Sequence, residues 1–490
     1  METMTSSTPA TNDATKTASP QTTGSLHPSG ATDEDAVAIN NSNRSTTPTS
    51  DEFTRYIMSG WAEHPDQLPS ERAQAPFAAA RRTALSRRYP GKRIVVRAGE
   101  MKQRSNDTFY GFRAHSAFSH LTGWAADSEP GSILVLDPEG DAHTATLYFR
   151  ERAGRESEEF YANPEIGEFW IGPRPSLKQV AADLGITTRA LSEFSADADD
   201  VTLSDETLSR DLSELRLVKD SYEIQQMRDA VDATGRGFND IIAQFKNIIG
   251  VDRGERLIES AFNTRARLDG NTVGYDTIAA SGSHACILHW TRNDGTVTDG
   301  DLILIDAGVE LDSLYTADIT RTLPVNGKFT PTQKAVYEAV LEAADEAFKI
   351  VRPGIRFREI HARAMEVIAR HTSEWGFLPV SLEETLREGS QYHRRYMVHG
   401  TSHHLGIDVH DCAQARRDLY MDGVLEEGMV FTIEPGLYFQ PDDLTVPEEF
   451  RGIGVRIEDD ILVTAEGAEN LSAGIPRTVD DVEAWIARIG

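Results

Sequence analysis

The sequence predicts an α/β protein, of mixed α+β character, with two folded domains behind a disordered tail. The chain has 490 residues, which is too long for one ordinary hydrophobic core. Short β-branched segments alternate with amphipathic helical segments over most of its length. The first fifty residues are rich in Ser, Thr, Pro and Asn, so we expect disorder over residues 1–50. The predicted domains span residues 51–214 and 215–490.

The composition excludes several classes of protein. Charged residues make up 26% of the chain and hydrophobic residues 39%, and no apolar run of about 18 residues could span a bilayer, so we expect no membrane association. The two cysteines, Cys286 and Cys412, imply no disulfide framework, which favours a reducing cytoplasm. The formal net charge of −29 repels nucleic acid, which leaves peptides or small molecules as the expected partners.

The first domain is predicted to combine short strands with flanking helices. Hydrophobic periodicity and the content of β-branched residues indicate which segments are helices and which are strands. The expected helices are Phe77–Tyr89 and Ser176–Leu184, and the expected strands are Lys92–Arg97, Ile133–Asp137 and Ala145–Arg150.

The second domain is predicted to begin with a long helix running towards Phe245. Either Asp220 or Ser221 can cap its first turn, where Glu223 also suits the helix dipole. A Thr-Pro-Thr-Gln sequence from Thr330 is typical of a later helix start. The later helices, which alternate with β-rich segments, are expected near Arg253–Leu268, Thr332–Val351 and Phe357–Ala369.

Two aspartates lie close together in the second domain. The apolar strand Leu302-Ile-Leu-Ile ends at Asp306, and Asp318 follows a short polar turn. If the hairpin is centred on Asp312, the two carboxylates are directly opposed, and like charges so placed destabilise a sheet unless a cation lies between them. The alternative is that one aspartate caps a turn and the other lies at the surface.

A group of histidines follows the two aspartates in the sequence. The segment between His399 and His410 also holds His403 and His404, and imidazole is both a common metal ligand and a general acid near neutral pH. Four such residues among apolar and glycine residues favour a functional site.

A third group of acids follows the histidines. Glu434 ends an apolar strand, and Pro435 keeps it extended. Arg456 and Glu458 project from one face of a strand, where an ion pair between them is the alternative to metal binding.

Together these residues resemble the aminopeptidase P branch of the pita-bread metallopeptidases. The resemblance covers roughly Arg81 to Ser472, and the stretch Arg104–Arg113 is similar to the family's N-terminal creatinase-like domain. The matching motifs, in the family's order, are Ile287-Leu-His289-Trp, Ile305-Asp306-Ala-Gly, Asp318-Ile-Thr-Arg-Thr322, His399-Gly-Thr-Ser-His403, Thr432-Ile-Glu434-Pro-Gly and Arg456-Ile-Glu458-Asp-Asp.

The resemblance implies a C-terminal pita-bread metallopeptidase domain with two Mn²⁺ ions per chain, and Co²⁺ or Zn²⁺ as possible substitutes. Asp318 and Glu458 would bridge the ions, and a metal-bridging hydroxide would attack the peptide bond. The twelve-residue separation of Asp306 and Asp318 is one longer than the family's. The implied metal ligands are Asp306, Asp318, His403, Glu434 and Glu458.

The resemblance also implies roles for other residues. His289 and His399 would line the pocket around the substrate's proline, and His410 would steady the oxyanion or the leaving nitrogen. Glu434 would carry a proton from water to that nitrogen. Arg456 would orient ligand carboxylates. The implied substrate-binding residues are His289, His399, His410 and Tyr438.

The expected function is removal of the N-terminal residue from peptides whose second residue is proline. A proline nitrogen carries no N–H and fixes φ, so the X-Pro bond needs a dedicated peptidase. The close alternative is a prolidase restricted to dipeptides, and the more distant one is a non-enzymatic binding protein of the same fold. The resemblance further implies a homodimer or homotetramer.

Overall fold

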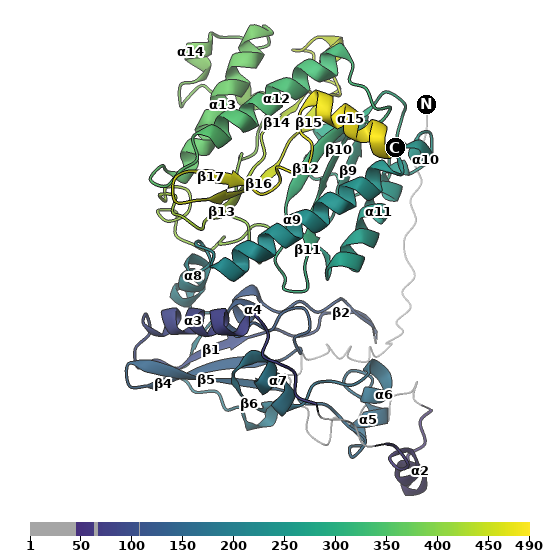
Figure 1. Ribbon diagram of the computed structural model, residues 1–490, viewed down its shortest axis with the longest axis vertical. Coiled ribbons are helices and arrows are strands. Elements are labelled where there is room, and N and C mark those ends of the chain that lie inside the picture. Colours follow the sequence, from purple (N-terminus) through teal and green to yellow (C-terminus); the bar gives the residue numbers. More distant parts are fainter. Residues whose placement is uncertain (1–45, 63–66, 107) are drawn as a thin grey trace, which may run out of the picture.

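The computed structural model describes residues 46–62, 67–106 and 108–490. The predicted tail over residues 1–50 lies outside this range except for 46–50. The chain forms two α/β halves, one below the other in Figure 1, which confirms the predicted fold class. The boundary between residues 214 and 215 stays a prediction. No helix within the described ranges is long and apolar enough to cross a membrane.

The lower half is built on a mixed five-stranded sheet in the order β6-β5-β4-β1-β7 (Figure 1). Its helices are α2 (Asp51–Ile57), α3 (Ala75–Ser86), α4 (Ser116–Thr122), α5 (Glu159–Ala162), α6 (Glu168–Ile171), α7 (Leu177–Leu184) and α8 (Glu206–Glu214). Its strands are β1 (Ile94–Arg97), β2 (Gln103–Ser105), β3 (Thr108–Phe109), β4 (Ile133–Glu139), β5 (Ala142–Phe149), β6 (Thr187–Ala190) and β7 (Val201–Thr202).

Side chains along the strands point alternately to the two faces of this sheet, and the helices cover one of these faces. Ile94 and Val96 belong to the core beneath α3, α4, α7 and α8, while Val95 points to the opposite face with Ile133. All predicted elements of this half are confirmed, with bounds shifted by a few residues. Helix α7 is fixed by a capping box between Ser176 and Gln179.

The upper half places several small sheets among long helices (Figure 1). Its helices are α9 (Ser221–Ile242), α10 (Phe245–Ile248), α11 (Gly254–Asp269), α12 (Pro331–Lys349), α13 (Phe357–Glu374), α14 (Leu382–Thr385) and α15 (Val479–Ile489). Its strands are β8 (Thr272–Val273), β9 (Ile278–Ser281), β10 (Leu302–Ala307), β11 (Val309–Glu310), β12 (Ile319–Pro324), β13 (Val430–Ile433), β14 (Gly436–Tyr438), β15 (Gly454–Arg456), β16 (Asp459–Val463) and β17 (Ala468–Asn470).

The long helices begin where the sequence predicts. Asp220, and not Ser221, caps α9, and Glu223 returns a hydrogen bond to the Asp220 backbone at 3.0 Å. Thr330 and Gln333 form the same kind of capping box at α12. These helices pack against the sheets β12-β10-β9 and β13-β16-β17 around one large apolar core.

The predicted register of the β10–β12 hairpin is wrong. Asp306 pairs with Thr320, so the hairpin is centred on Ser313 and Asp318 is a diagonal, not an opposed, neighbour of Asp306. The reason lies in the turn, where Leu314 adopts φ +71° and is fully buried in a core cluster shared with Ala125. Because Asp318 and Thr320 are two residues apart, both aspartates still face the same side of the sheet.

Arg321 ties β12 to the strand that follows Glu458. Its side chain has no exposed surface and donates hydrogen bonds to the Asp459 carboxylate at 2.8 Å and to the Glu458 carbonyl at 2.6 Å. It also reaches the carbonyls of Ile475 and Pro476 at 3.2 and 3.0 Å. One guanidinium therefore joins three chain segments in the interior.

We expect Arg321→Met to lower the free energy of unfolding of the upper half by about 3–5 kcal/mol, because it leaves Asp459 and several carbonyls buried without this partner. Urea unfolding followed by circular dichroism measures the loss. The matched control is Arg370→Met, which removes an exposed pair with Glu342 and should cost under about 1 kcal/mol. Equal losses in the two variants would contradict the structural role of Arg321.

Candidate metal centre

Five side chains with metal-binding chemistry line one cavity of about 520 Å³ in the upper half. They come from β10, the residue before β12, the loop after Tyr396, the end of β13 and the turn between β15 and β16. Strand ends therefore converge at the cavity, although the residues are far apart in the sequence. The five are Asp306, Asp318, His403, Glu434 and Glu458.

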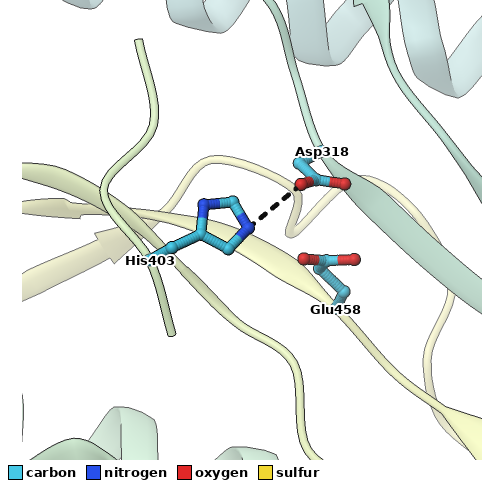
Figure 2. Close-up of side chains that lie close together, drawn as sticks. All are labelled: Asp318, His403 and Glu458. Carbon is cyan, nitrogen blue, oxygen red and sulfur yellow. Dashed lines mark ion pairs between the residues drawn. The ribbon is translucent and has the colours of Figure 1, made fainter. Parts of the chain in front are cut away.

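Asp318, His403 and Glu458 form the tightest part of this group (Figure 2). One potential ligand atom from each lies within 4.8 Å of the others, close enough to hold a metal ion. His403 Nε2 lies 3.2 Å from Asp318 Oδ2 and 3.8 Å from Glu434 Oε1. The imidazole thus stands between two carboxylates of the group.

The two aspartates of the hairpin share one hydroxyl group. The Tyr275 hydroxyl lies 2.7 Å from Asp306 Oδ1 and 2.5 Å from Asp318 Oδ1. A hydroxyl has one proton and can donate to only one of them at a time. Tyr275 therefore holds the two carboxylates side by side without neutralising either.

Two further polar residues fix the carboxylates from behind. Thr320 donates from Oγ1 to Glu458 Oε2 at 2.7 Å, and its carbonyl accepts the Glu458 N–H at 3.1 Å. The Asp318 N–H donates to the fully buried Asp460 carboxylate at 3.2 Å. These contacts orient the acids before any ligand is bound.

The cluster is short of positive charge. Burial raises the pKa of Glu458 well above its usual range, and the Asp318 charge adds to the shift. Burial also raises the pKa of Glu434 to about 7, although His403 opposes the shift. For His403 burial lowers the pKa, but the hydrogen bond and charge of Asp318 outweigh it and raise the pKa to about 9. Burial is the first cause of the shifts at Glu458 and Glu434, and neighbouring carboxylates add to them. A divalent cation would lower the cost of keeping these buried acids charged.

Arg456 supplies part of the missing charge. Its guanidinium is buried and donates to Asp306 Oδ2 at 2.5 Å, so the ion pair considered between Arg456 and Glu458 is replaced by one with Asp306. The donor set that remains holds four carboxylates and one imidazole. Such an oxygen-rich set fits a hard divalent cation such as Mn²⁺.

A chain of hydrogen bonds runs from Arg456 to the cavity wall at His399. Arg456 donates to the Tyr438 hydroxyl at 3.2 Å, and that hydroxyl lies 2.7 Å from His399 Nε2. His399 Nδ1 donates to the Gly400 carbonyl at 2.6 Å, which leaves Nε2 to accept from Tyr438. Burial and the Arg456 charge lower the pKa of His399 to about 3, which favours this neutral form.

Of the remaining predicted residues, two line the cavity and one does not. His289 and His410 line the cavity and are exposed, and the His410 ring meets the His403 ring edge-on with centroids 4.4 Å apart. Tyr438, predicted to bind substrate, is buried behind His399 and does not line the cavity. Among the described residues, its side-chain hydrogen bonds go to His399 and Arg456.

Sequence reasoning assigned no role to Tyr275, Thr320 or Asp460. Thr320 could have been found from alternation, because it lies two residues after Asp318 and therefore on the same face. Asp460 was part of a quoted motif, and its fully buried carboxyl was not foreseeable from spacing. Tyr275 lies in a separate segment before β9, and no local pattern connects it with the aspartates.

Comparisons with known proteins agree with this architecture. The profile of "Metallopeptidase family M24" matches residues 225–465, and that of "Aminopeptidase P, N-terminal domain" matches residues 78–208. The chain is 48% identical over 463 residues to Xaa-Pro aminopeptidase 1 of Streptomyces coelicolor, covering 90% of this chain and 93% of the relative. It is 32% identical over 444 residues to the Xaa-Pro aminopeptidase of Escherichia coli, covering 85% and 98%.

Solved structures of aminopeptidase P are also similar to this chain. Aminopeptidase P from E. coli with the inhibitor Pro-Leu has a TM-score of 0.73 at 30% identity, covering 86% of this chain and 99% of that one. Proline aminopeptidase P II from Yersinia pestis has a TM-score of 0.72 at 32% identity, covering 84% and 99%. The chain therefore belongs to metallopeptidase family M24 and, within it, to the aminopeptidase P group.

Proposed function

We propose that the protein is a two-metal Xaa-Pro aminopeptidase, which hydrolyses the first peptide bond of peptides with proline in second place. The observation that carries this proposal is the convergence of four carboxylates and one imidazole in a single cavity. The names and 48% identity of the Streptomyces relatives support the substrate class.

The proposed metal ligands are Asp306, Asp318, His403, Glu434 and Glu458, holding two Mn²⁺ ions per chain. Bound metal would polarise the scissile carbonyl and lower the pKa of the attacking water. Glu434 receives the proton from that water and delivers it to the proline nitrogen. Its carboxylate lines the cavity, which places it where such a proton transfer can occur.

The proposed substrate site is the cavity wall formed by the histidines. His399 is neutral, and its position is fixed by Tyr438, so it presents a constant surface to the proline and the residue after it. His289 and His410 flank the opening, and His410 stabilises the oxyanion or the leaving nitrogen. Ile278, which also lines the cavity, adds apolar surface suited to a pyrrolidine ring.

The proposal also covers the cellular location, the oligomeric state and the domain boundaries of the protein. We place it in the cytoplasm, as a homodimer or homotetramer, with a first domain over residues 51–214 and a catalytic domain over 215–490. Light scattering of the purified protein tests the oligomeric state.

We expect Asp318→Asn to lose most bound Mn²⁺ and to lower kcat/KM by at least about 100-fold, because altering even a residue that supports a ligand costs 10–100-fold. Metal analysis per chain and peptide hydrolysis are the two measurements. Asp312→Asn, at an exposed position in the same hairpin, is the matched control and should keep both. Full metal content with normal turnover in Asp318→Asn would remove this residue from the ligand set.

Replacing Glu434 by Gln should lower kcat by about 10³-fold or more while the fold is kept, because the variant loses a ligand and the proton carrier together. Steady-state kinetics with saturating Mn²⁺ gives the number. Glu427→Gln, at an exposed position nearby, serves as the control. A loss below about tenfold would mean that Glu434 has neither role.

Substrate length separates the proposal from a prolidase. Because His289 and His410 are exposed at the cavity, chain beyond the proline has a way out, and we expect kcat/KM for an X-Pro-X tripeptide to exceed that for the X-Pro dipeptide by about tenfold or more. Acetylating the N-terminus should stop cleavage, since the free amine is proposed to bind metal. Preference for the dipeptide would make the enzyme a prolidase, and cleavage of the acetylated peptide would contradict an exopeptidase.

A further inference from the structure

The segment Leu405–Asp411, which we call the His410 loop, is held by contacts before and after His410, whereas the His410 ring itself makes few contacts. The His410 ring makes no hydrogen bond with another side chain or backbone group in the part of the chain that the structure describes. Its one close ring contact there is the edge-on contact with His403, at 4.4 Å between centroids. The backbone of the loop therefore sets the point from which the imidazole extends into the cavity.

Before His410, the loop is held by the N-terminal half of the chain. Ser116, the first residue of α4, donates from Oγ to Asp408 Oδ1 at 2.6 Å. Arg113 donates to the Ile407 carbonyl at 2.6 Å, and its guanidinium lies 3.2 Å from Asp408 Oδ1. Figure 1 shows α4 at the upper edge of the lower half, facing the upper half.

Arg113 has a second partner in the upper half. Its Nε donates to Glu310 Oε2 at 2.7 Å, and Glu310 is almost fully buried in β11. The guanidinium is thus fixed at one end against the hairpin that carries Asp306 and Asp318, and at the other against the His410 loop. Arg113 therefore connects the hairpin with the His410 loop, which both contribute residues to the cavity, without lining the cavity itself.

After His410, the loop is anchored by the segment between α8 and α9. Arg216 donates to the buried Asp411 carboxylate at 2.8 Å, and the Lys219 ammonium lies 3.7 Å from the same group. A Cβ at Gly406 would lie 2.4 Å from Asp411 Oδ2, so a larger residue there would displace this ion-paired carboxylate. His410 is thereby held between two anchored aspartates.

The two anchors differ in burial. Asp411 is 1% exposed, so its ion pairs belong to the packed interior. The Asp408 and Arg113 side chains are 32% and 34% exposed, and partly exposed pairs add little to stability. The contacts of Asp408 are better suited to setting the position of the loop than to holding the fold together.

We propose that Ser116 and Arg113, acting through Asp408 and the Ile407 carbonyl, are positioning residues for His410, so that the N-terminal half completes the active site of its own chain. This inference rests on the proposed function, which gives His410 its role near the oxyanion. Small misplacement of a catalytic group lowers kcat strongly, on the order of 100-fold for 1 Å.

The test uses Ser116→Ala and Asp408→Asn in the full-length, Mn²⁺-loaded protein. Each should lower kcat for an X-Pro-X tripeptide by about 10- to 100-fold while KM, metal content and melting temperature stay unchanged. Hydrogen–deuterium exchange of peptides covering Ile407–His410 should become faster. Ser116→Thr, which keeps the hydroxyl, should keep kcat within about threefold.

Epistasis with His410 gives the decisive measurement. If the contacts act through His410, then Asp408→Asn should cause no further loss of kcat in a His410→Ala background. Glu469→Gln is the matched control, because Glu469 forms a similarly exposed pair with Arg228 and does not touch the loop. It should leave kcat and loop exchange as they are.

The failures are distinguishable. A further loss of fivefold or more in the His410→Ala background, or unchanged kcat in both single variants, overturns the positioning role alone. An unchanged kcat in His410→Ala itself overturns the proposed role of His410, and the inference with it.

Discussion

Four carboxylates share one buried cavity in this protein, and their mutual repulsion is the constraint on which the surrounding structure depends. Like charges removed from water repel strongly, and each raises the pKa of its neighbours. The protein offsets part of this cost with Arg456, which is buried against Asp306. A divalent cation would supply the remaining positive charge, so the repulsion between these acids favours the binding of a metal ion.

The backbone around the cavity serves to hold these acids in place. Asp318 and Glu458 directly precede β12 and β16, and Arg321 of β12 joins the two strands by donating to the Asp459 carboxylate at the start of β16. Thr320 then links to Glu458, and Tyr275 lies between the two aspartates. Thr320 and Tyr275 thus hold carboxylates of the cavity through neutral hydroxyl groups, which add no charge to the cluster.

The histidines occupy the less buried side of the cavity and are held differently. His399 depends on a hydrogen-bond chain from Arg456 through Tyr438, so the cation that balances the acids also fixes the tautomer of a wall residue. His410 depends on its loop, and that loop is anchored from both halves of the chain. The carboxylates of the cavity thus lie on strands or directly beside them, whereas its histidines, His403 included, lie on loops.

The sequence by itself determined the α/β class, one helix start at Asp220 or Ser221 and another at Thr330, and, through the family resemblance, the set of acids and histidines that meet at the cavity. The helix starts follow from local rules, because capping and periodicity act over a few residues, whereas the set of site residues follows from motifs that resemble those of the family. Only the tertiary structure decided the register of the β10–β12 hairpin, the partner of Arg456 and the contact of Ser116 with Asp408. Leu314 explains the first of these: its burial against the other half of the chain stabilises a turn conformation that local preference disfavours, and no short stretch of sequence contains that contact.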